Sequence, residues 1–349
     1  MTTNRPHKYF LQEHLHRQGV VHGGVGNIDA EKILMRKGFQ PVLFPCLDGF
    51  SILAKLRRTW FLFKTVFSLP AGALFVIQFP VYPRLHQSLV RLLARRKQVN
   101  VICFIADIDG LKTADAQLLE REKTTYRSFQ YFIVHNEAME QWIRQVVPGC
   151  RVTQIGFFDF LTTPVVQERR PSADIVFAGN LAKSRFLWQL EQLQASPLRF
   201  LLYGPYEATA DRWPANTRYE GVYEPYRLPA QLAGSYGLVW DGDSIEQAGG
   251  PLGDYMAYIS HHKLSLYLLA GLPIITARKA ASAALVAQYG IGYAVDSLQE
   301  ITALIAGIDD STYQQLVANT RTLAQQISQG KRLGDALDRI EAMIAAETT

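Results

Sequence analysis

Apolar and polar positions follow two alternating periods along almost the whole chain. Short apolar runs typical of buried strands are separated by longer stretches in which apolar residues recur at helical spacing. In the first half, the runs predict strands at residues 8–11, 40–44, 72–79, 99–105, 130–135 and 151–155. Helical spacing fills the intervals, for example over residues 30–38, 84–97 and 136–145. Such alternation is typical of parallel sheets with helices on both faces.

The same alternation restarts after residues 158–172, a polar, proline-containing stretch that we interpret as a linker. The second half predicts strands at residues 173–179, 197–204, 218–222, 236–242, 273–276 and 291–295. Two such units predict an α/β protein of two facing Rossmann-like domains, with parallel sheets and a central cleft where ligands bind. We set its parts at an N-terminal domain, a linker, a C-terminal domain and a C-terminal helix expected to pack back across the domains: residues 1–158, 159–172, 173–330 and 331–349.

Length and cysteine content agree with a two-domain cytosolic protein. The 349 residues are enough for two hydrophobic cores. The three cysteines, Cys46, Cys103 and Cys150, are far apart. Their spacing indicates neither a disulfide framework nor a zinc site, which fits a reducing compartment. The first residues contain no signal-peptide core, so we expect a cytoplasmic protein.

The most apolar stretch, residues 59–82, does not predict a membrane span. Lys64, Pro70 and Gly72 interrupt it, and an uninterrupted span needs about 20 apolar residues. We interpret this stretch as the end of a helix, a turn and a buried strand.

Charge is distributed unevenly between the two halves. Residues 1–170 contain 23 Lys and Arg against 13 Asp and Glu, a net charge of +10, whereas residues 171–349 have a net charge of −5. Basic clusters occur at residues 55–58 and 91–97. This excess indicates an anionic partner or peripheral contact with the inner face of a membrane, with a solvated helix face as the alternative. Nucleic acid is not expected, because no recognition motif accompanies the charge.

The sequence "YISHHKLSLYLLAGLPIITAR" at residues 258–278 predicts a helix followed by a turn and a buried strand. Ser260 is in place to cap this helix. Lys263 and Ser265 then lie in its first turn, where unpaired amides and the helix dipole favour an anion, above all a phosphate. The alternative is an ordinary exposed lysine.

A second turn repeats this logic. "VFAGNLAKSRFL" at residues 176–187 predicts a strand, a Gly-Asn turn at Asn180, and a helix that starts with Lys183 and Ser184. Backbone amides and a cation are again directed at the cleft. Two such turns in one domain favour an anion-binding role over chance.

Two pairs of aspartates follow predicted strands. Asp107 and Asp109, in "FIADIDGLK", are candidates for a general base, with a turn or a helix cap as the alternative. Asp241 and Asp243, in "WDGDS", have the spacing of carboxylates that hold a divalent metal on a sugar nucleotide. Because aspartates are common in turns after strands, we expect a turn here and no metal site.

The glycines of "HGGVGNIDAEK" resemble a dinucleotide fingerprint but do not complete it. Gly24 and Gly26 have the right spacing, whereas the position of the third glycine is Asp29. The preceding strand also ends about ten residues too early. We interpret the segment as a glycine loop facing the cleft, with a plain loop as the alternative.

The second half resembles bacterial galactofuranosyltransferase-like enzymes, a group that includes the glucosyltransferase of serine-rich adhesins. The similarity lies in "GLVWDGDSIEQAGGPLGDYMAYISHHKLSLYLLAGLPII", "FAGNLAKS" and "YEGVYEPYRLP", and "IADIDGLK" extends it into the first half. The resemblance implies a glycosyltransferase of the GT-B fold that uses a uridine diphosphate (UDP) sugar and needs neither metal nor cofactor. It implies a glycan, glycoprotein or lipid-linked acceptor, and we also expect a homo-oligomer.

The resemblance also assigns residues to roles. Lys263, with the amides of Leu264 and Ser265, would hold the donor diphosphate, and Lys183 would face the same phosphates. Asn180, in the turn before Lys183, is a further candidate for donor binding. Val222 and Tyr223 would hold the uracil, and Gly24 and Gly26 would approach the donor from the first domain. Asp107, Asp109 and His22 are the candidates for the base that deprotonates the acceptor hydroxyl.

The chain departs from the family pattern at three positions. Ser260 and His261 replace Asn and Pro in the Asn-Asn-Pro-His-Lys sequence, and Ala106 replaces the histidine before the first aspartate. A sugar-nucleotide epimerase of the same architecture and a non-catalytic nucleotide-binding subunit are the competing classes. Retention of both basic turns favours the transferase.

Overall fold

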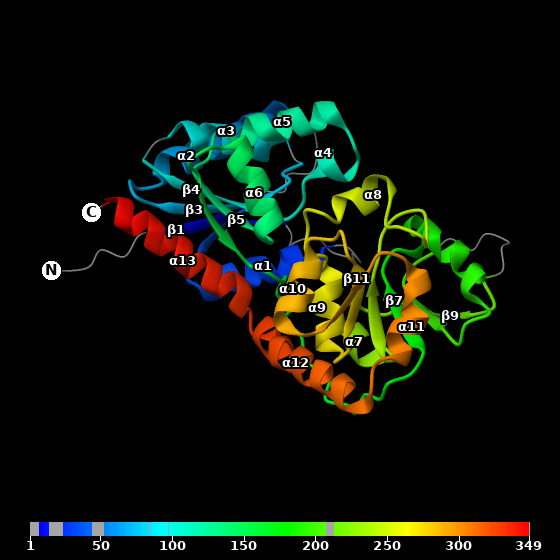
Figure 1. Cartoon of the computed structure of the whole chain (residues 1–349). Helices are drawn as coiled ribbons and strands as arrows, with labels where there is room; N and C mark the ends of the chain where they lie inside the picture. Colours follow the sequence, from blue (N-terminus) through cyan, green and yellow to red (C-terminus); the bar gives the residue numbers. More distant parts are fainter. Residues whose placement is uncertain are drawn as a thin grey trace.

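The computed structural model describes residues 7–13, 24–43, 52–82, 84–96, 98–206 and 213–348. Within these residues the chain forms two parallel six-stranded sheets, each flanked by helices (Figure 1). The predicted arrangement of two Rossmann-like units is therefore confirmed. Cys46 lies outside the described residues.

The first sheet has the strand order β2-β1-β3-β4-β5-β6. Its strands are β1 (Lys8–Leu11), β2 (Gln40–Val42), β3 (Leu74–Phe79), β4 (Asn100–Ile105), β5 (Tyr131–Val134) and β6 (Arg151–Gln154). Its helices are α1 (Val25–Arg36), α2 (Ile52–Ser68), α3 (Arg84–Arg95), α4 (Asp109–Lys112), α5 (Ala116–Tyr126) and α6 (Glu137–Val146).

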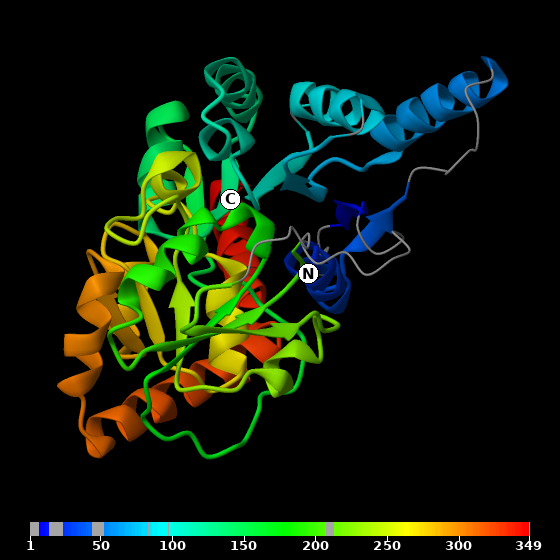
Figure 2. The same cartoon turned by 90° about the vertical axis from the view of Figure 1, so that its right-hand side faces the viewer.

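Strand residues of the first sheet alternate between two hydrophobic cores, as a pleated strand buried on both faces requires. Leu74 and Val76 pack in the core with α1, whereas Phe75 and Ile77 pack in the core with α2, α3, α5 and α6. The apolar stretch over residues 59–82 comprises the end of α2, a turn and β3, as predicted. Helices α2 and α3 lie at one end of the molecule (Figure 2).

The second sheet has the order β12-β11-β10-β7-β8-β9, which is the 3-2-1-4-5-6 order of a dinucleotide-type Rossmann sheet. Its strands are β7 (Asp174–Ala178), β8 (Arg199–Tyr203), β9 (Thr217–Gly221), β10 (Tyr236–Val239), β11 (Ile274–Ala277) and β12 (Gly292–Val295). The α-helices that accompany them are α7 (Leu228–Gln231), α8 (Gly250–Tyr255), α9 (His262–Leu269), α10 (Ser282–Tyr289), α11 (Ile301–Ala306) and α12 (Asp310–Ser328).

Three short 3₁₀ helices complete the second unit: η1 (Leu181–Lys183), η2 (Arg185–Leu193) and η3 (Leu298–Glu300). The α-helix predicted to start at Lys183 is wrong, because η1 and η2 take its place. The chain therefore turns more tightly after β7 than an α-helix would.

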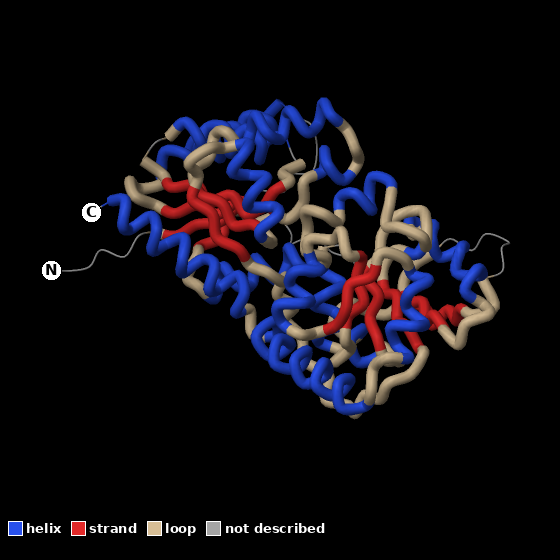
Figure 3. Tube along the Cα trace, viewed as in Figure 1, coloured by secondary structure: helices blue, strands red, loops and turns tan. Residues whose placement is uncertain are grey.

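The segment between β6 and β7 contains neither helix nor strand, and it packs against the second unit. Arg169 is buried there, and its guanidinium donates hydrogen bonds to the carbonyls of Leu232, Gly234 and Ala270. The last helix, α13 (Lys331–Thr348), lies along the first sheet, with Leu333 and Leu337 in its core (Figure 3). Among the described residues, no helix is long and apolar enough to cross a membrane.

Candidate functional site

The strand order of the second sheet reverses between β7 and β10, which are hydrogen-bonded neighbours. In open α/β sheets, ligands bind outside the carboxyl ends of the strands at such a reversal. Gly179 and Asn180 follow β7 at this edge, and Trp240 and Asp241 follow β10. Helix α9 begins at the same place and contributes Lys263.

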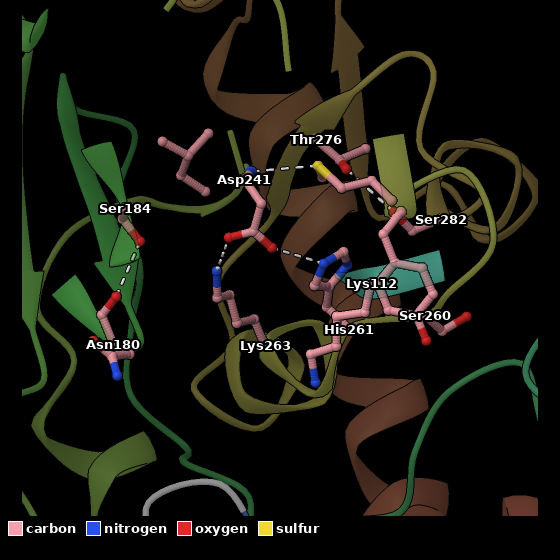
Figure 4. Close-up of polar contacts among 12 residues, drawn as sticks. Lys112, Asn180, Ser184, Asp241, Ser260, His261, Lys263, Thr276 and Ser282 are labelled. Carbon is pink, nitrogen blue, oxygen red and sulfur yellow. Dashed lines mark hydrogen bonds and ion pairs between the residues drawn. The ribbon is translucent and has the colours of Figure 1, made fainter. Parts of the chain in front are cut away.

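Asp241 holds two cationic or potentially cationic side chains in place (Figure 4). Nζ of Lys263 donates to Oδ1 of Asp241 at 3.0 Å, and Nε2 of His261 lies 2.8 Å from Oδ2. The ammonium also lies 4.5 Å from the centre of the Phe177 ring. A Cβ at Gly179 would be only 3.0 Å from Cε of Lys263, so glycine at this position leaves room for the lysine.

The electrostatics of this cluster fix its charge. Burial by itself would raise the pKa of Asp241, but the charge of Lys263 and the hydrogen bond and charge of His261 lower it well below its ordinary value. Asp241 is therefore ionised throughout the physiological range. Its side chain is 19% exposed and that of Lys263 is 18% exposed, so the pair lies at the rim of the site and not in the core.

The first turn of α9 contains Leu264 and Ser265, whose amides are expected to hold the diphosphate. The Leu264 amide already donates to the carbonyl of His261 at 3.0 Å. Ser265 is completely buried, and its hydroxyl donates to the Phe158 carbonyl at 2.5 Å. The amides that a helix N-terminus leaves without intrahelical partners are the earlier ones, at His262 and Lys263.

Ser260 does not cap α9, contrary to the prediction. The residue that caps this helix is His261, and it does so without a side-chain hydrogen bond. The Ser260 hydroxyl accepts from Nδ2 of Asn136 at 3.1 Å, and its amide donates to Nδ1 of His135 at 3.2 Å. Ser260 thus connects the start of α9 to the end of β5 in the first unit.

The remaining predicted donor residues surround this edge of the second sheet. Asn180 and Lys183 are exposed, and the Asn180 carbonyl accepts from Ser184 (Figure 4). Val222 and Tyr223 follow β9, with Val222 exposed and Tyr223 packed 6.1 Å from Tyr203 between ring centres.

The glycines of the first unit meet the start of α9. Gly24 is the N-cap of α1, and a Cβ at Gly26 would be 3.1 Å from Cδ2 of His262 and 3.4 Å from Cδ1 of Phe158. Gly26 therefore permits close packing between the N-terminal ends of α1 and α9. Both helix ends are regions of positive potential. His22 lies outside the described residues.

Asp107 and Asp109 follow β4 at the carboxyl edge of the first sheet. Oδ2 of Asp107 pairs with Nζ of Lys112 at 2.8 Å, and Oδ1 accepts from the Tyr255 hydroxyl at 3.0 Å. Oδ2 of Asp109 accepts from the Tyr82 hydroxyl at 2.7 Å. Both carboxylates are partly exposed, which a base acting on a bound acceptor requires.

Helix α8 connects the acidic and basic groups. The hydroxyl of Tyr255 bonds to Asp107, and the sulfur of the next residue, Met256, accepts from the Asp241 amide at 3.3 Å. Tyr255 is part of the first unit's core and Met256 is part of the second unit's core. The structure thus brings Asp107 and the Asp241–Lys263 pair to the same junction, although 134 residues separate the two aspartates in sequence.

Sequence reasoning missed two contacts across this junction. Asp29 is fully buried and accepts from the Leu161 amide at 2.8 Å and from the Tyr226 hydroxyl at 2.7 Å. His135 is buried, and burial lowers its pKa to about 4, so it is neutral at physiological pH. The sequence contains no signal for the role of Asp29 beyond its place at the third fingerprint position, because the burial of an acidic side chain is a property of the folded structure.

The contacts of the Asp241 carboxylate bear on whether it holds a metal. Both of its carboxylate oxygens are already bonded to nitrogen atoms of Lys263 and His261. In the part of the chain that the structure describes, no three His, Cys, Asp or Glu side chains are grouped as metal ligands.

Two facing Rossmann-like units, each a parallel sheet flanked by helices, form the GT-B fold. Solved structures share this fold. Sucrose-phosphate synthase from Thermosynechococcus elongatus superposes with a TM-score of 0.64 at 12% identity, covering 98% of this chain and 100% of that one. HepE from Anabaena, in complex with UDP and glucose, gives a TM-score of 0.60 at 13% identity, covering 96% and 100%.

Sequence comparison identifies the family to which the chain belongs. Residues 17–155 match the N-terminal domain and residues 175–340 the C-terminal domain of the Glucosyltransferase 3-like family. The chain belongs to this family and is a glycosyltransferase. It is 28% identical to the beta-1,6-galactofuranosyltransferase WbbI of Escherichia coli, covering 70% of this chain and 72% of that protein. It is 26% identical to Glucosyltransferase 3 of Streptococcus gordonii, covering 67% and 68%.

Proposed function

We propose that the chain transfers a hexosyl group, glucose or galactofuranose, from a UDP-sugar to a hydroxyl of a glycan, glycoprotein or lipid-linked acceptor. The observation that carries the proposal is Lys263, held by Asp241 at the N-terminus of α9 where the strand order reverses. An ammonium has three donors, and the hydrogen bond to Asp241 uses one, so others remain for phosphate oxygens. The names of the relatives support a glucosyl or galactofuranosyl donor.

Charge develops on the leaving nucleoside diphosphate as the sugar–phosphate bond breaks. Preorganised cations and helix amides stabilise that charge. Lys263, the amides of His262 and Lys263, and the exposed Lys183 would supply this stabilisation, with Val222 and Tyr223 beside the uracil. Asp107 is the proposed base for the acceptor hydroxyl, and Lys112 and Tyr255 would hold it in position.

We also propose that the reaction needs no divalent metal. A metal on Asp241 would have to displace Lys263 and His261, which together keep that partly exposed carboxylate ionised. Turnover is expected to continue in excess chelator. Complete loss of turnover on chelation, restored by manganese or magnesium, would contradict this.

A panel of sugar nucleotides tests the donor. UDP-glucose and UDP-galactofuranose should raise the melting temperature, because a ligand that binds the folded state stabilises it by mass action. Incubation with the donor alone distinguishes the classes: an epimerase converts the sugar without an acceptor, whereas a transferase gives at most slow hydrolysis. Absence of stabilisation by every UDP-sugar would contradict the proposed donor class.

A further inference from the structure

The outward face of α2 carries a row of exposed apolar side chains, which we name the α2 stripe. Its members are separated by three or four residues and so lie on one side of the helix. They are Leu53 (79% exposed), Leu56 (62%), Trp60 (61%), Phe63 (45%) and Phe67 (72%). Phe63 and Phe67 stack on each other with ring centres 6.3 Å apart.

The α2 stripe does not belong to the hydrophobic core. Leu62 and Val66, on another side of the helix, are buried and pack against the first sheet. The helix is therefore apolar both toward the core and toward solvent. Contiguous exposed apolar surface of this kind marks an interaction site in soluble proteins. Figure 2 shows α2 projecting at the edge of the molecule, away from the second unit.

The segment that contains α2 and α3 carries charge of one sign. Residues 49–106 contain nine Lys and Arg and no Asp or Glu. Within this range, Arg57 and Lys64 are exposed on α2, and Arg91 and Arg95 are exposed on α3. Helix α3 packs against α2, so the two helices form one basic, partly apolar surface.

The combination of exposed apolar and basic side chains on α2 and α3 indicates which kind of partner binds this surface. A second copy of the chain would bring the same cations against these, and like charges repel. The basic residues also continue from α2 onto α3, so they are not confined to one helix. An anionic lipid surface offers both negative headgroups and an apolar interior, and in-plane membrane helices combine Trp, Phe and Leu with Lys and Arg. We propose that α2 lies in the plane of an anionic membrane, with the α2 stripe inserted and the cations of α2 and α3 on the headgroups.

This proposal is independent of the donor chemistry, because the α2 stripe consists of none of the residues assigned to the donor or the acceptor. It places the acceptor side of the enzyme at the membrane, where a lipid-linked acceptor would be presented.

Co-sedimentation with vesicles tests the proposal. The full-length protein should bind vesicles of phosphatidylcholine and phosphatidylglycerol at low salt, should not bind phosphatidylcholine alone, and should dissociate as salt rises. The double variant Trp60→Ala/Phe67→Ala should lose binding. Val166→Ala, at an exposed residue of the segment that connects β6 to β7, should retain it.

A second pair of variants isolates the charge. Arg57→Ala/Arg91→Ala/Arg95→Ala should weaken binding by about 100-fold, since each cation near an anionic surface contributes about fivefold. The matched control removes three exposed cations elsewhere, Arg36→Ala/Arg121→Ala/Lys331→Ala, and should bind like the parent. Arg96 is kept, because its guanidinium donates to the Val66 carbonyl.

Quenching by brominated lipids tests insertion directly. Tryptophan fluorescence of the parent should be quenched on binding, and Trp60→Phe should bind but lose this quenching. A parent protein that ignores anionic vesicles at low salt overturns the proposal. So does binding without quenching, which means headgroup contact only. A stripe-dependent dimer in size-exclusion chromatography without vesicle binding would assign α2 to a second copy, and stripe-dependent binding to an acidic protein in place of vesicles would assign it to a protein partner.

Discussion

The two six-stranded sheets have related topologies but different chemistry at their carboxyl ends. The second sheet reverses its strand order between β7 and β10, and there it presents Lys263 on a helix N-terminus with Asp241 as counter-ion. The first sheet presents carboxylates after β4, Asp107 and Asp109, held by Lys112 and Tyr82. One edge is suited to an anionic leaving group and the other to removing a proton. The comparison teaches that the side chains placed after β4 and at the start of α9, and not the sheets themselves, give the two edges their different charge.

The net charge of each half is opposite in sign to the groups at the carboxyl end of its sheet. The first half has the excess of +10, yet its carboxyl edge presents two aspartates, and exposed cations lie on α2 and α3. The second half is net negative, yet it holds Lys263 and Lys183. The charge that a site uses is set by a few positioned groups, whereas the net charge of a half describes its outer surface.

The largest expected effect comes from removing the Asp107 carboxylate at the carboxyl end of the first sheet. Asp107→Asn should lower kcat by about 10²–10⁴-fold, the usual contribution of a general base, while UDP affinity stays unchanged. Asp109→Asn is the matched control, because it neutralises the neighbouring carboxylate. Normal turnover in Asp107→Asn with loss in Asp109→Asn would move the base to Asp109.

Removing the cation of the basic edge should have the next largest effect. Lys263→Ala should weaken UDP binding by about 1.5–3 kcal/mol, the range for hydrogen bonds to charged groups. Because Lys263 also pairs with Asp241, the variant should lose stability as well, so affinity is measured by titration calorimetry well below its melting temperature. Lys279→Ala, which removes a surface partner of Asp254, is the control. Equal UDP affinity in Lys263→Ala and the parent would refute the diphosphate role.

The junction between the sheets should be sensitive to acid through His135. Burial lowers its pKa in the folded state from 6.5 to about 4, so the unfolded chain binds the extra proton between these values. The contribution of neutral His135 to the unfolding free energy is complete above about pH 6.5 and is lost as pH falls toward about 4. The unfolding free energy is lower by about 2 kcal/mol near pH 5.

Asn at position 135 keeps an acceptor for the Ser260 amide and cannot titrate. His135→Asn should therefore flatten the fall in unfolding free energy between about pH 6.5 and pH 4 in urea titrations. An unchanged slope would show that His135 does not titrate on unfolding.

The smallest expected effect concerns the hydrogen bond between Asp29 and Tyr226. Tyr226→Phe removes the hydroxyl that also contacts Nζ of Lys32, and should reduce the unfolding free energy by about 0.5–1.5 kcal/mol. Tyr82→Phe, at an exposed hydroxyl within the first unit, is the matched control and should cost less. Equal stability of Tyr226→Phe and the parent would show that this contact adds nothing to the junction.

The sequence by itself determined the two-unit α/β architecture, because each buried strand is a local apolar run and each helix has its own period. It also determined that Lys263 stands in the first turn of a helix before a strand. The family resemblance extended this to the class of enzyme. These properties depend on residues that are close in sequence, so a local pattern is sufficient to show them.

Only the tertiary structure decided which partners the functional groups have. Asp241 looked like a turn or a metal ligand, and Ser260 looked like a helix cap. The fold instead pairs Asp241 with Lys263 and joins Ser260 to His135 in the other unit. It also leaves the α2 stripe exposed, which the sequence analysis did not predict. These outcomes depend on the packing of segments far apart in the chain, and no local pattern of apolar and polar residues records which segments will meet.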